Sequence, residues 1–93
     1  MITAVVLISA DKGALPKLGE DLAAVPGVSE VYSVTGEFDF IAMVRAKQHE
    51  DLAEIVTSRI AQTKGVARTQ THVAFRAYSK LDLDSVFGMD DRD

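Results

Sequence analysis

Two groups of polar residues interrupt apolar, strand-like segments and are the best candidates for a binding site. One group lies at a predicted hairpin tip and the other on one predicted strand: Thr35, Gly36, Glu37 and Asp39; Thr69 and Thr71. Hydroxyls and turn amides can donate hydrogen bonds to a carboxylate, and a side-chain carboxylate can accept them from an ammonium group. Residues two apart on a strand face the same side, so both threonines can contact one ligand. These groups suit a small zwitterion. The spacing alone is also compatible with no binding site, in which case Thr69 and Thr71 are ordinary strand residues and Asp39 is a turn residue.

Residues for catalysis or metal binding are scarce. The chain has no cysteine, and its two histidines are His49, beside a predicted helix start, and His72, in a predicted strand. Glu50, Asp51 and Glu54 are typical of a solvated helix face. No glycine cluster could cradle a phosphate, and no serine or threonine lies in a nucleophile turn. We therefore expect no catalytic residue, no metal site and no cofactor.

The charge of the chain is concentrated at its end. Residues 81–93 hold five of the 14 acidic residues and one of the 10 basic residues, so residues 1–80 are neutral. Without a basic face, direct binding of nucleic acid is not expected. No apolar run reaches the roughly 20 residues of a membrane span, and the N-terminus lacks signal-peptide features. We expect a cytoplasmic protein without membrane contact.

Hydrophobic periodicity predicts the element order β-α-β-β-α-β over residues 1–80. The expected strands are 2–9, a hairpin over 28–46 that reverses at 34–39, and 66–79; the expected helices are 15–25 and 50–63. Each helix is followed by glycine and valine, at an offset of 38 residues. Two such halves predict an α+β, ferredoxin-like sandwich, in which a four-stranded antiparallel sheet carries both helices on one face.

The sheet face opposite the helices is expected to be apolar. The first strand carries apolar residues on both sides, including Val5 and Leu7. The third strand is also apolar on both sides, with Ile41 and Met43 on one and Phe38, Phe40, Ala42 and Val44 on the other. Monomers rarely expose an apolar face of this extent. We therefore expect a homodimer in which two copies pack sheet to sheet, in a barrel-like α/β pairing.

The hairpin tip and the last strand together resemble a known family. The residues Thr35-Gly36-Glu37-Phe38-Asp39-Phe40 and Gly65-Val66-Ala67-Arg68-Thr69-Gln70-Thr71 are similar to motifs of the C-terminal effector-binding domain of Lrp/AsnC (leucine-responsive, feast/famine) transcriptional regulators. The resemblance spans nearly all of residues 1–80. It implies dimers that assemble into an octamer or similar ring and bind an amino acid or related effector between dimers. The implied ligand contacts are Thr35, Gly36, Glu37, Asp39, Thr69 and Thr71.

The chain departs from this family at both ends. Full regulators carry an N-terminal helix-turn-helix domain, whereas this chain starts directly at its first strand. We therefore expect a stand-alone ligand-binding domain that affects transcription indirectly, by assembling with a full-length relative. Residues 81–93 form a separate acidic tail, which we expect to be either a short docking helix or disordered.

Two other functions remain open from the sequence. One is a structural assembly module that has lost effector binding. The other is an enzyme of the dimeric ferredoxin-like group, such as a small monooxygenase or haem-degrading protein. Such enzymes usually need a well-placed histidine, asparagine, tryptophan or arginine in their cleft. Tryptophan is absent here, and His72 is the one candidate.

Overall fold

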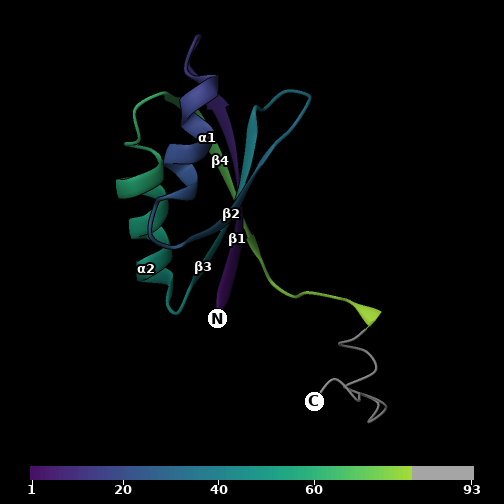
Figure 1. The fold of residues 1–93 in the computed structure, drawn as a ribbon. Helices are drawn as coiled ribbons and strands as arrows, with labels where there is room; N and C mark the ends of the chain where they lie inside the picture. Colours follow the sequence, from purple (N-terminus) through teal and green to yellow (C-terminus); the bar gives the residue numbers. More distant parts are fainter. Residues whose placement is uncertain (81–93) are drawn as a thin grey trace.

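Four strands form one antiparallel sheet, and the helices cover one of its faces (Figure 1). The computed structural model describes residues 1–80. The elements are β1 (Ile2–Ala10), α1 (Leu15–Ala23), β2 (Val28–Ser33), β3 (Phe40–Ala46), α2 (His49–Ala53), its π-helical continuation η1 (Glu54–Ile60) and β4 (Val66–Ala74). The strand order is β2-β3-β1-β4. This arrangement confirms the ferredoxin-like βαββαβ fold, whereas the expected acidic tail lies outside the described residues.

The core lies between the sheet and the helices, and β1 is at its centre. The side chains of Ala4, Val6 and Ile8 are fully buried, because alternate residues of a strand face one side. The neighbouring strand β3 and both helices supply the other buried apolar side chains: Leu18, Leu22, Phe40, Ala42, Val44, Ala46, Leu52, Ile55 and Ile60. Each large side chain stabilises the fold by about 1.5–3 kcal/mol through burial.

Helix α1 follows the expected pattern with small differences. Pro16 lies in its first turn, where a missing N–H costs no helical hydrogen bond, and Leu18 and Leu22 are buried four residues apart. Leu15 is three residues before Leu18, a helical spacing that predicts burial on the same side, but it is 49% exposed. The helix ends at Ala23 rather than at residue 25, because the residue before Pro26 avoids helical conformation.

The second helix widens into a π-helix over η1. The Ala61 N–H donates to the Val56 carbonyl five residues earlier, at 2.9 Å. At 3.6 residues per turn, side chains five residues apart point roughly 140° away from each other. The wider turn brings Ile55 and Ile60 toward the same side, and both are buried. The helix ends at Ile60, whereas the sequence predicted an end at residue 63.

Two equivalent glycine turns connect the helices to the strands that follow. Gly27 and Gly65 both have a φ of 102°, and their carbonyls accept hydrogen bonds from the N–H groups of Arg45 and Asp11. A Cβ atom at Gly27 would overlap the side chain of Ile55 in the other helix. These turns account for the repeat at 38 residues, and they fix both helices against the sheet.

The last strand and the hairpin differ from expectation. Strand β4 ends at Ala74 rather than at residue 79, because Ala74 pairs with Thr3 and β1 itself begins at Ile2. A longer β4 would have almost no neighbouring backbone to bond. Strand β3 begins at Phe40, so Phe38 lies in the β2–β3 loop rather than in the strand.

The contact of Gly27 with the second helix predicts a large stability loss for Gly27→Ala. An alanine at positive φ costs about 1–3 kcal/mol, and overpacking against Ile55 adds about 1–3 kcal/mol. Gly13→Ala and Gly36→Ala are matched controls, since their φ values of 86° and 112° bracket that of Gly27 and a Cβ there meets nothing within 4 Å. Urea unfolding measures all three. Equal losses would contradict the steric explanation.

Candidate functional site

The sheet face opposite the helices is uncovered and apolar at its centre, as expected. Val5 and Leu7 of β1 and Ile41 and Met43 of β3 are half-buried, and Tyr32 of β2 is 49% exposed. Leu7 lies directly opposite Ile41, and Val5 opposite Met43. We call this surface, centred on these five residues, the open face.

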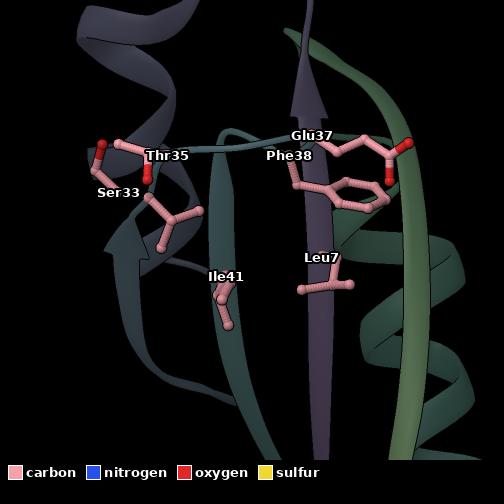
Figure 2. A pocket seen from close by; sticks show the side chains of 7 residues that line it. Leu7, Ser33, Thr35, Glu37, Phe38 and Ile41 are labelled. Carbon is pink, nitrogen blue, oxygen red and sulfur yellow. The ribbon is translucent and has the colours of Figure 1, made fainter.

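A depression of about 610 Å³ lies at one end of the open face, beneath the β2–β3 loop (Figure 2). It is lined by Leu7, Ser33, Val34, Thr35, Glu37, Phe38 and Ile41. Leu7 and Ile41 form an apolar floor, with Thr35 near the end of β2. Glu37 and Phe38 reach across β1 toward β4. The depression thus combines an apolar floor with a hydroxyl and a carboxylate. We call it the loop pocket.

Asp39 attaches the loop to the central strand. Its backbone N–H donates to the Ile8 carbonyl at 2.9 Å, and its Oδ2 accepts a hydrogen bond from the Ala10 N–H at 2.7 Å. Ile8 pairs with Phe40, so a longer β3 would place Phe38 opposite Ala10. Because Phe38 has left the sheet, the Asp39 carboxylate supplies the acceptor that the backbone would have provided.

A second contact holds the loop against β4. The guanidinium carbon of Arg68 lies 5.0 Å from the centre of the Phe38 ring, within the range of a cation–π interaction. Arg68 pairs with Ser9, which is on the same side of β1 as Leu7, so the contact forms on the open face. Gly36, with a φ of 112°, precedes both attached residues and allows the chain to reverse at the tip of the loop.

The two threonines of β4 lie on the other side of the sheet. Thr69 and Thr71 are opposite Ile8 and Val6, whose side chains are buried beneath the helices. Thr69 is half-buried and Thr71 is exposed. Thus the structure brings Thr35 and Glu37 together around the loop pocket, with Gly36 and Asp39 in the same loop. It does not bring the threonine pair into that pocket within one chain.

Sequence reasoning missed six residues of this site. Five line the loop pocket, namely Leu7, Ser33, Val34, Phe38 and Ile41, and the sixth is Arg68 beside it. The alternation of apolar residues along β1 and β3 places Leu7 and Ile41 on apolar faces of their strands. This pattern could have identified them as part of a binding surface. The stacking of Arg68 on Phe38 depends on the path of the loop, for which the sequence holds no periodic signal.

Other polar groups form no comparable site among residues 1–80. No group of three or more histidine, aspartate or glutamate side chains there is placed to hold a metal ion. The helices of this part of the chain are too short or too polar to cross a bilayer. The Nε2 atom of His72 lies 3.1 Å from the side-chain amide nitrogen of Gln70. A hydrogen bond to the Glu30 carboxylate raises the pKa of Tyr32 above its ordinary value.

A second depression lies near the start of α1, away from the open face. It is lined by Asp11, Lys12, Gly13, Ala14, Pro16, Lys17, Leu18, Asp21, Lys64 and Gly65. Lys17 in this group forms a salt bridge with Asp21 at 3.3 Å.

Comparison with known proteins identifies the family. The family model of the Lrp/AsnC ligand binding domain matches residues 3–82. The chain belongs to this family. An HTH-type transcriptional regulator of Pyrococcus furiosus, itself uncharacterized, is 42% identical over 76 residues, which cover 78% of this chain and 51% of the regulator. The chain thus spans about half the length of the curated relatives it matches.

Solved structures agree with this assignment. A crystal structure from Thermus thermophilus is 50% identical, with a TM-score of 0.80, and the match covers 86% of this chain and all of that one. A feast or famine regulatory protein from M. tuberculosis, complexed with L-methionine, is 27% identical with a TM-score of 0.72. That match covers 86% of this chain and 54% of the regulator. The family resemblance expected from the two motifs is therefore confirmed.

The Asp39 contact predicts that this residue is needed for stability, whether or not a ligand is bound. Asp39→Ala leaves the Ala10 N–H without its acceptor and should lower the free energy of unfolding by about 1–3 kcal/mol. Asp39→Asn, which keeps an acceptor oxygen, should lose less. Urea unfolding without ligand measures both. A fully stable alanine variant would contradict the structural role.

Proposed function

We propose that this chain is a regulatory module that binds an amino acid in the loop pocket. The observation that carries the proposal is the pocket lining, in which Leu7 and Ile41 form an apolar floor beside the Thr35 hydroxyl and the Glu37 carboxylate. A carboxylate accepts hydrogen bonds from an ammonium group, and hydroxyls and loop amides donate to a carboxylate. The relative complexed with L-methionine supports this ligand class. A module of this kind would act without catalysis and in the cytoplasm.

The open face supports pairing with a second copy. The half-buried side chains of Val5 and Met43 and the exposed Tyr32 form a continuous apolar surface that a second sheet would cover. A twofold dimer uses the same surface on both partners. Dimers would then assemble into an octamer or similar ring. A full-length regulator with the same domain could take the place of one copy, which would give the module an indirect role in transcription.

Thr69 and Thr71 enter the proposal through a neighbouring chain. Within one chain they face away from the loop pocket, on the side of β4 that carries the helices. Thr71 is exposed there and free to meet another copy. We place these threonines at the contact between dimers, where they would complete the pocket of an adjacent chain.

Amino-acid binding predicts a thermal shift. A ligand at about 100 times its dissociation constant stabilises the folded state by about 2.7 kcal/mol, which should raise the unfolding midpoint by roughly 10 °C in a domain of this size. The measurement is a thermal screen against the common amino acids at millimolar concentration. Thr35→Val should reduce the shift, whereas Thr57→Val, on the helical side, should not. No shift with any amino acid would contradict the proposal and favour an assembly module without effector.

Pairing through the open face predicts that Met43→Lys separates the copies. The introduced ammonium group would be taken out of water in the interface, at a cost that exceeds the small loss of apolar contact. We expect the variant to be a folded monomer in sedimentation velocity, while the wild type and Ala53→Lys, on the exposed surface of α2, form dimers or larger rings. A wild-type monomer at micromolar concentration would contradict the pairing.

A further inference from the structure

The loop pocket contains one charge and no protein partner for it. Among its lining residues only Glu37 is ionisable, and the Glu37 carboxylate makes no hydrogen bond or ion pair within residues 1–80. Figure 2 shows this carboxylate extending beyond Phe38 toward β4. A carboxylate in this position can accept hydrogen bonds from an ammonium group of a ligand that lies on the apolar floor.

A cation lies next to the same aromatic ring. The guanidinium carbon of Arg68 lies over the Phe38 ring, 5.0 Å from its centre, and Arg68 too makes no ion pair within the described part of the chain. The N–H groups of a guanidinium lie in its own plane, so those that do not face the ring can contact a ligand. Two of these N–H groups can donate parallel hydrogen bonds to the two oxygens of a carboxylate. The ammonium group of a lysine cannot form this two-pronged contact.

We propose that Glu37 and Arg68 bind the two charges of an amino acid whose side chain is apolar. The ligand ammonium group contacts Glu37, the ligand carboxylate contacts Arg68 beside Phe38, and the ligand side chain packs on Leu7 and Ile41. Arg68 thereby becomes a specificity-determining residue of the site. The inference rests on the proposed function, because it assigns the orientation of the ligand in the same pocket.

The apolar floor sets the side-chain preference. Leu7 and Ile41 lie directly opposite each other, and their side chains carry no hydrogen-bond donor or acceptor. A polar or charged ligand side chain would lose water there without a partner, which costs binding free energy. Leucine and methionine lose no such hydrogen bonds, so they are suitable first probes.

The test measures the contribution of each ligand charge separately. Isothermal titration compares L-methionine and L-leucine with their amides, which lack the carboxylate, and with their N-acetyl forms, which lack the ammonium group. Charge-assisted hydrogen bonds predict that the wild type binds the free amino acid about tenfold or more tightly than either derivative. Arg68→Gln should lose the preference over the amide and keep the preference over the N-acetyl form. Glu37→Gln should show the reverse.

Two control variants separate charge recognition from general effects. Arg45→Gln removes an exposed arginine from the far end of the open face, on β3, and Glu54→Gln removes an exposed carboxylate from the helical side. Both should bind as the wild type does. Arg68→Lys keeps the charge without the fork and should keep only part of the preference over the amide.

The possible results distinguish this inference from the proposed function. Tight binding with unchanged preferences in both glutamine variants would overturn the roles of Arg68 and Glu37 and leave the amino-acid site in place. If a polar amino acid binds and neither L-methionine nor L-leucine does, the ligand side chain does not pack on Leu7 and Ile41, and that part of the inference is wrong. If no amino acid binds the wild type, the proposed function and the inference both fail.

Discussion

The central strand has apolar side chains on both faces, and the rest of the molecule depends on this constraint. On one side of β1, Ala4, Val6 and Ile8 are fully buried beneath the helices and form the centre of the core. On the other side, Val5 and Leu7 remain half-buried because no helix covers them. Since a strand alternates its side chains, the same nine residues stabilise the fold and create an apolar surface for binding. The loop pocket and the proposed pairing surface both follow from the second side.

The β2–β3 loop turns this apolar surface into a site with polar groups. The Asp39 carboxylate accepts a hydrogen bond from the Ala10 N–H just before β3 begins, and Arg68 holds Phe38 against β4. These attachments come from β1 and β4, the two strands that lie beyond β3 in the sheet. The loop can therefore present Thr35 and Glu37 above Leu7 without a backbone ladder of its own. Attachment by side chains also links the site to β4, the strand whose threonines we place at the contact with another chain.

Local sequence patterns predicted most of the fold. Contacts between residues far apart in the sequence could not be predicted in this way. The order of elements, the glycine turns at Gly27 and Gly65 and the apolar open face came from periodicity and from turn chemistry. The spacing of Thr69 and Thr71 showed that they share a face, but the register with β1 decides which face, and a shift of one residue would reverse it. The π-helical turn and the end of β4 depend on packing and pairing with neighbours. For the candidate site, the loop was predicted and its apolar floor and Arg68 were not.

The most direct test of the account is a backbone amide TROSY spectrum of the protein titrated with L-methionine. Binding in the loop pocket predicts chemical-shift changes at Leu7, at residues 34–39 and at Ile41, with little change around Gly13 and Lys64 in the second depression. Changes centred on the second depression, with a silent β2–β3 loop, would contradict the placement of the site on the open face.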